Sequence, residues 1–396
     1  MNKQNLTLVL TAVRDIIDRH SCQCNVAAPI HTYGITWECG STSPACTRIG
    51  DSAAFEDPVP AIGTGSGSSP FDPLMPWAGM VRSTDANAGE VVAIPKYWYR
   101  INKDGNTLSV EIADGAKDGF SVSPAHMDRG DGKGERDVVY VGRYHCGMSD
   151  VAVAEARDNP LLSTMLGSVS GKVPQANGTR SDFREAIHAL GDNVWQMDYA
   201  TYWTIAMLYL VEFANWDSQA MIGYGCGDGG AAVASGYTDS MTYHTGTNLS
   251  DRTSYGNGVQ YRWIEGLWDN VSDWIDGYYQ SNLAVNIIMN PAEFSDTEGG
   301  IAIGNVSEAM GYITDWAVPD VDGYSWAMLP SGFNADDPNS SVGVGDMSEF
   351  NLGGVVLVFG GGFGVQSPDF GLFSLGGSDG ASAAYGLVGA RLLVLP

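Results

Sequence analysis

The chain has 396 residues, of which 44% are hydrophobic, so it can bury a sizeable core in one large domain or in several. Its formal net charge of −26 argues against nucleic acid and anionic membrane surfaces as partners, because both attract clusters of Lys and Arg. Only 17% of residues are charged, whereas 51 are glycine, which favours an irregular, β-rich fold. No segment reaches the roughly 18 uninterrupted apolar residues of a membrane helix, so we expect no membrane insertion.

Residues 1–24 are predicted to contain an oligomerisation or docking helix over positions 2–20. Leu6, Val9, Val13 and Ile16 are spaced by three and four residues, as in the core positions of a short coiled coil. The alternative is an amphipathic helix that packs on its own chain. No signal-peptide pattern is present, so we expect synthesis in a bacterial cytoplasm.

Residues 25–90 are predicted to form a small β-rich attachment region. Tyr33, Ile35 and Trp37 alternate on one face of a strand within the segment 32–55. Cysteines are too few for a disulfide scaffold, so free thiols are favoured, although Cys39 and Cys46 could close a loop in an oxidising medium. The six cysteines are Cys22, Cys24, Cys39, Cys46, Cys146 and Cys226.

Two strands are predicted next, Val91–Ile101 with an irregularity at Pro95, and Val138–Tyr144. The charged loop 128–135 between them could hold calcium, but it lacks the EF-hand register and a solvated turn is preferred. His145 and Cys146 are neighbours on a strand and point to opposite faces, so His145 is expected to be a partly exposed polar residue, not a metal ligand.

Two helices follow. Asp182 with Glu185 predicts a capping box for a helix that ends at Gly191, and Asp198 is expected to cap a one-faced amphipathic helix from Tyr199 to Ala214. Glycines cluster at 223–230 and indicate turns. Trp263, Trp268 and Trp274 are predicted to form a core corner whose indole N–H groups donate to carboxylate or carbonyl groups.

The C-terminal segment 355–391 is predicted to be a display surface. The apolar runs Val355–Phe359 and Ala390–Leu395 read as buried strands, and the segment from Gly360 to Gly386 contains nine glycines, these two included. Glycine and exposed aromatic residues held between two fixed strands suit a ligand-binding face. The candidate ligand-binding residues are Phe363, Gln366, Asp369, Phe370, Phe373, Ser378, Asp379 and Tyr385. For Phe370, Phe373 and Tyr385 the alternative is an inward position in the core.

Three segments in this order resemble a known family. Gln-Met-Asp-Tyr-Ala-Thr stands at 196–201, Asp-Asn-Val-Ser-Asp-Trp at 269–274, and Gly-Ala-Arg-Leu at 389–392. Over residues 91–396 they resemble the C-type lectin fold of the formylglycine-generating-enzyme branch. That branch includes the variable proteins of diversity-generating retroelements, which bind ligands with a hypermutated C-terminal stretch. Residues 33–37 and 69–71 resemble tail proteins of bacteriophages that infect gut bacteria.

The resemblance implies an α+β fold with short antiparallel sheets, many loops and two main helices in residues 91–396, beside the N-terminal helix and small β unit. It also implies a non-enzymatic receptor-binding protein at the tip of a bacteriophage or prophage tail. Such an adhesin would bind a host cell-surface protein or glycan, and would attach to other virion tail proteins through its N-terminal region. No cysteine follows Cys226, so the paired copper-binding cysteines of the enzymes are missing. We therefore expect no cofactor and no metal.

Two other interpretations of the sequence stay open. The first is a tail-associated enzyme, either a formylglycine-type oxidase or a glycan hydrolase. The second is a head-fibre or decoration protein of the same virion. Paired acids occur, but 46 Asp and Glu residues make such pairs common by chance.

The spacing of the N-terminal apolar residues predicts a homo-oligomer, with a trimer favoured. Burial of Leu6, Val9, Val13 and Ile16 contributes about 1.5–3 kcal/mol for each side chain. Light scattering on the intact protein should therefore give a multiple of 42.1 kDa. A monomer at micromolar concentration would contradict this prediction.

Overall fold

A computed structural model describes residues 29–152, 164–225, 230–334, 343–362 and 369–396. The predicted N-terminal helix lies outside the described residues, as do Cys22, Cys24 and Cys226. The other three cysteines, Cys39, Cys46 and Cys146, are free thiols, as the sequence predicted.

The chain is mostly β, with 37% strand and 11% helix, and its small sheets are arranged as a four-bladed β-propeller. The predicted α+β class with a C-type lectin fold is therefore wrong. The segments that suggested it do form a capped helix, a buried Trp strand and a terminal strand. Such local motifs report on single elements and do not determine how separate sheets are arranged around a core.

The strands in the described residues form five sheets. In a five-stranded sheet the order is β2 (Thr47–Gly50), β1 (Thr32–Glu38), β7 (Thr107–Ala113), β6 (Trp98–Asp104) and β8 (Ser121–Val122). In a six-stranded sheet it is β11 (Val194–Gln196), β25 (Arg391–Val394), β9 (Val138–Ala152), β10 (Thr164–Ser168), β5 (Gly89–Pro95) and β4 (Arg82–Asp85). In a four-stranded sheet it is β14 (Ile264–Glu265), β13 (Val259–Tyr261), β12 (Gly246–Thr247) and β3 (Ala61–Ile62).

The remaining two sheets come from the C-terminal half. In a seven-stranded sheet the order is β20 (Leu329–Asn334), β19 (Ala309–Ala317), β21 (Met347–Phe350), β23 (Leu375–Asp379), β22 (Val356–Phe359), β15 (Ser272–Ile275) and β24 (Val388–Gly389). In a three-stranded sheet it is β16 (Tyr278–Ser281), β17 (Ala284–Ile287) and β18 (Ile301–Asn305). The helical elements are α2 (Arg180–His188), α3 (Tyr199–Phe213), α4 (Ser218–Met221), and the short 3₁₀ turns η1 (Trp77–Gly79), η2 (Pro124–His126) and η4 (Pro291–Glu293).

Strand β1 confirms the alternation predicted near the N-terminus. Tyr33, Ile35 and Trp37 are all buried. β1 pairs with β7 along its whole length, from Thr32 opposite Ala113 to Glu38 opposite Thr107. Residues on both sides of position 90 therefore share one sheet, and the division into an attachment region and a binding domain stays a prediction of the sequence.

The predicted strand over residues 91–101 is two strands in two different sheets. β5 ends at Pro95 and β6 begins at Trp98. Proline has no N–H group to donate to a neighbouring strand, so it ends the pairing here and does not merely bend it. The strand predicted at 138–144 is confirmed as the first half of β9.

Helix α2 begins one turn earlier than the sequence suggested. The capping box joins Thr179 and Asp182: the Thr179 hydroxyl accepts from the Asp182 N–H at 3.1 Å, and the Asp182 carboxylate accepts from the Thr179 N–H at 2.9 Å. Asp182 is thus the third residue of the helix, not its cap. Its carboxylate performs the role that the sequence analysis had assigned to Glu185.

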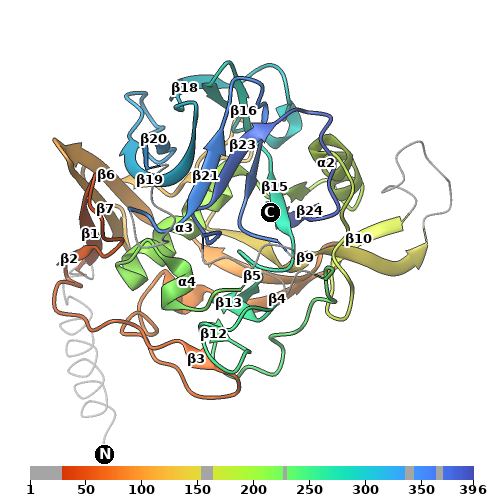
Figure 1. The fold of residues 1–396 in the computed structure, drawn as a ribbon, viewed down its shortest axis with the longest axis horizontal. Helices are drawn as coiled ribbons and strands as arrows, with labels where there is room; N and C mark the ends of the chain where they lie inside the picture. Colours follow the sequence, from red (N-terminus) through yellow and green to blue (C-terminus); the bar gives the residue numbers. More distant parts are fainter. Residues whose placement is uncertain (1–28, 153–163, 226–229, 335–342, 363–368) are drawn as a thin grey trace, which may run out of the picture.

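Helix α3 confirms the predicted cap but not the predicted single apolar face. The Asp198 carboxylate accepts from the Thr201 N–H at 2.8 Å, and Ala214 ends the helix in the left-handed conformation. Every residue of α3 is buried, because the helix lies between the sheet that contains β1 and the seven-stranded sheet (Figure 1). Its acidic residue, Glu212, is neutralised by Arg262 at 2.5 Å.

The tryptophan corner is largely confirmed. Trp268 and Trp274 are fully buried, and their indole N–H groups donate to the carbonyls of Gly223 at 3.0 Å and Gly178 at 3.1 Å. Trp263 is only half-buried, and the guanidinium of Arg82 lies 4.6 Å from its ring centroid.

Two polar residues are more deeply buried than the sequence analysis expected. His145 was expected to be partly exposed, but it is buried 3.6 Å from Asp273, and burial holds its pKa well below the usual value. Arg129, from the charged loop 128–135, is also buried and forms an ion pair with Asp198. A single histidine or arginine in a sequence carries no pattern that reveals its burial.

Replacement of Trp274 by alanine should lower the free energy of unfolding by about 3–5 kcal/mol, because it opens a large cavity and leaves the Gly178 carbonyl without its donor. Thermal unfolding of Trp274→Ala beside Trp263→Ala measures this, and the Trp263 variant should lose less. A Trp274 variant with an unchanged melting temperature would show that this residue does not support the core.

Candidate functional site

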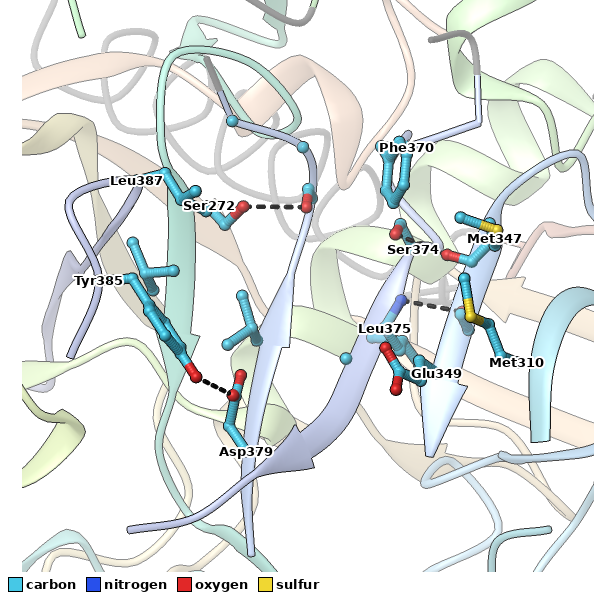
Figure 2. A pocket seen from close by; sticks show the side chains of 17 residues that line it. Ser272, Met310, Met347, Glu349, Phe370, Ser374, Leu375, Asp379, Tyr385 and Leu387 are labelled. Atoms are coloured by element: carbon cyan, nitrogen blue, oxygen red, sulfur yellow. Dashed lines mark hydrogen bonds between the residues drawn. The ribbon is translucent and has the colours of Figure 1, made fainter. Parts of the chain in front are cut away.

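A trough of about 410 Å³ lies on the solvent-facing side of the seven-stranded sheet (Figure 2). Strand register builds its floor. Met310 on β19 pairs with Glu349 on β21, Glu349 pairs with Gly376 on β23, and Gly376 pairs with Val358 on β22. Because the third residue in this row has no side chain, the sheet surface is hollow between Glu349 and Val358.

Apolar side chains form the walls of the trough. Tyr385 and Leu387 stand on one side, and Phe370 and Met347 on the other (Figure 2). Met310 is 55% exposed, Tyr385 43% and Leu387 40%. Large apolar groups gathered around a hollow in this way are typical of ligand sites.

Two contacts fix the side chain of Tyr385, one to its ring and one to its hydroxyl group. Its ring stacks on the buried Trp274 ring at 6.4 Å between centroids. Its hydroxyl donates to the Asp379 carboxylate at 2.7 Å (Figure 2). The exposed aromatic ring is therefore held in one orientation before any ligand arrives, which limits the entropy lost on binding.

The two strands predicted to frame the display surface are both present, as β22 and β25; β25 is fully buried, and β22 is buried except at the half-buried Val358. The segment between them differs from the prediction, because it contains the strand β23 in addition to loops. β23 pairs with β21 on one side and with β22 on the other. Part of the predicted display segment thus serves as the floor of the trough.

The structure brings three of the predicted ligand-binding residues together at the trough, namely Phe370, Asp379 and Tyr385. Phe373 instead points into the core, where it is 0% exposed and packs edge-on against Trp216 at 4.7 Å between centroids. For Phe373 the inward alternative is therefore the observed one.

The other predicted residues lie outside the lining. Ser378 is half-buried in β23 beside the trough. Asp369 is half-buried, and its carboxylate accepts from the Tyr312 hydroxyl at 2.7 Å. Phe363 and Gln366 lie outside the described residues.

Met310, Met347 and Glu349 were missed by the sequence analysis. The local signal for the last two is the alternation in β21, where Ser348 and Phe350 are buried, Met347 is half-buried and Glu349 is exposed. That alternation indicates a half-buried strand, but nothing in the sequence shows which strands lie beside it.

The charges at the trough have one sign. Among the described residues of its lining, Glu349 and Asp379 are the acids, and none is Lys, Arg or His. Asp379 already accepts from Tyr385. The Glu349 carboxylate is exposed and, within the described parts of the chain, has no hydrogen bond or ion pair.

The buried side chains of Asp346 and Ser218 hold the segment that carries Phe370. The Asp346 carboxylate accepts from the N–H groups of Gly371 and Phe373, both at 2.7 Å. The Ser218 hydroxyl, in the first turn of α4, accepts from the Leu372 N–H at 2.9 Å. Burial raises the pKa of Asp346 well above its usual value, and raises that of Asp217, the cap of α4, to about 6.

In the part of the chain that the structure describes, no group of three or more His, Cys, Asp or Glu residues is placed to hold a metal ion. The helices in those same ranges are too short or too polar to cross a bilayer. No protein-family model matches the chain, and a search of curated proteins finds no match.

The protonation of Asp217 should stabilise the folded state as the pH falls from 7 to 5. The pKa of Asp217 is about 6 in the folded protein and about 3.8 in the unfolded chain. The folded state therefore binds more protons in this window, and the free energy of unfolding falls as the pH rises through it, by about 1–3 kcal/mol for this group. Asp217→Asn keeps the helix cap but has no proton to lose.

Urea unfolding between pH 4 and pH 7 tests this prediction. Asp217→Asn should show a shallower loss of stability with rising pH than the unchanged protein. Parallel curves for the two proteins would contradict it.

Proposed function

We propose that the chain is a non-enzymatic binding protein that receives a host cell-surface molecule in the trough, as an adhesin at the tip of a bacteriophage or prophage tail. The observation that carries the binding role is the hollow at Gly376, surrounded by exposed apolar side chains on a framework of paired strands. The place in a phage tail is supported by the resemblance of residues 33–37 and 69–71. Attachment to other tail proteins through the N-terminal region is part of the same proposal.

The character of the walls supports binding over catalysis. Methionine side chains adapt their shape to different partners, and aromatic rings supply contact area at low entropic cost. The Asp379 carboxylate already accepts a hydrogen bond from the Tyr385 hydroxyl at 2.7 Å. Glu349 is therefore the acid of the described lining that is available to a ligand. The oxidase interpretation has no support, because no cysteine follows Cys226.

A single substitution can fill the trough without disturbing the sheet. A β-carbon at Gly376 would lie 3.9 Å from the nearest atoms of Val358, which is ordinary contact, and Gly376 does not need a left-handed conformation. Valine is also well suited to a strand. Gly376→Val should therefore fold normally and close the hollow between Glu349 and Val358.

The matched control is Gly380→Val, which adds the same side chain where no atom lies within 4 Å and which is outside the trough lining. Fluorescently labelled protein is incubated with a panel of gut bacterial strains and counted by flow cytometry. We expect binding to at least one strain, a loss of at least about tenfold for Gly376→Val, and no loss for Gly380→Val.

Two results would overturn the proposal. One is equal cell binding by a Gly376→Val protein whose melting temperature is unchanged. The other is the absence of binding to every strain by the unchanged protein. A loss of polymer mass when host capsular or cell-wall glycan is incubated with the protein would establish the hydrolase alternative instead.

A further inference from the structure

We propose that the trough takes a protein segment in which a Lys or Arg side chain stands beside an apolar side chain. This inference rests on the proposed function and names the chemistry of the ligand. It follows from a carboxylate that has no partner among the described residues, from the apolar walls around it, and from the polar groups of the lining that are already hydrogen-bonded within the protein.

Glu349 is the charge that a ligand would meet. It lies in the floor row between Met310 and Gly376, and it has no partner within the described ranges. A bound apolar group would cover this carboxylate and remove water from it, which is costly for an isolated charge. A cation on the ligand would offset that cost, and the interaction would strengthen as water is excluded.

The walls fit the rest of such a ligand. Met310, Met347 and Leu387 offer flexible aliphatic surface, and Phe370 and Tyr385 offer ring faces and edges. Lys and Arg carry long apolar stems that pack on surfaces of this kind while the charged end reaches a carboxylate. A volume of about 410 Å³ accommodates a few side chains of a partner.

The polar groups of the lining favour protein over glycan. The hydroxyls of Ser272 and Ser374 donate to the carbonyls of Gly360 at 3.2 Å and Met347 at 2.7 Å. The Ser348 hydroxyl accepts from the Leu375 N–H at 2.9 Å. These groups are already used within the protein, so a neutral sugar would leave many of its hydroxyls without partners, which is unfavourable.

The electrostatic field of the whole chain also favours a cationic ligand. With a formal net charge of −26 and no basic residue in the described part of the lining, the protein attracts cationic groups and repels anionic ones over several ångströms of solvent. Binding should therefore weaken as salt is added.

Three probes that differ in one group test this inference: 4-phenylbutylamine, 4-phenylbutanol and 4-phenylbutanoate. Each is titrated into the full chain labelled at its methionine methyl groups, and the Met310 and Met347 signals are followed by NMR. We expect the amine to bind at least about fivefold more tightly than the alcohol, the acid to bind most weakly, and added salt to weaken the amine alone.

Two matched variants locate the effect. Glu349→Gln keeps the shape of the side chain and should remove the preference for the amine over the alcohol. Glu298→Gln removes one negative charge from an exposed position outside the trough and should leave the preference unchanged.

Equal affinity for amine and alcohol, or an unchanged preference in Glu349→Gln, would overturn the ligand class. Failure of all three probes to shift Met310 and Met347 would overturn it as well. None of these results bears on cell binding by Gly376→Val. The cell-binding experiment therefore tests the proposed function separately from the ligand class.

Discussion

Arg391 is fully buried, and its guanidinium group donates five hydrogen bonds to groups on three different sheets. The acceptors are the Asp273 carboxylate and the carbonyls of Gly142, Arg143, Glu265 and Gly266, at 2.9–3.2 Å. They belong to, or directly follow, strands of the six-stranded, seven-stranded and four-stranded sheets. Removal of this one side chain would leave a buried carboxylate without its counter-ion and several carbonyls without donors, which typically costs at least 3–5 kcal/mol. The relative positions of the three sheets therefore depend on it.

The same interaction positions the trough. Asp273 lies in β15, which pairs with β22 beneath the trough and, through Ser272 opposite Val388, with β24. β24 ends at Gly389, and Arg391 begins the next strand. The loop that carries Tyr385 and Leu387 is thus held at its C-terminal end by a strand two residues from the buried guanidinium. A hollow with exposed aromatic walls can persist in water because the framework beneath it is rigid.

The sequence could predict those features of the fold that depend on residues close together in the chain. The cap at Asp198, the alternation in β1, and the buried strands at 355–359 and 390–395 all have local signals, and all of them form. The arrangement of the sheets was predicted wrongly, because motifs shared with another fold describe single elements. The trough floor could not be predicted at all, because it joins Met310, Glu349, Gly376 and Val358 through strand register between distant segments. Phe373 illustrates the same limit, since an aromatic residue in a glycine-rich segment suits either a surface or a core.

The central claim is that partners bind at the trough, and methionine oxidation measures this directly. The protein is treated with dilute peroxide, free or bound to cells of a strain that it recognises, and sulfoxide is quantified at each methionine by mass spectrometry. Met310 is 55% exposed, while Met75 at 48% and Met148 at 47% are outside the trough lining and serve as internal references. The account predicts that binding slows oxidation of Met310 and Met347 severalfold and leaves Met75 and Met148 unchanged. Equal protection of all four, or protection of the reference residues alone, would contradict it.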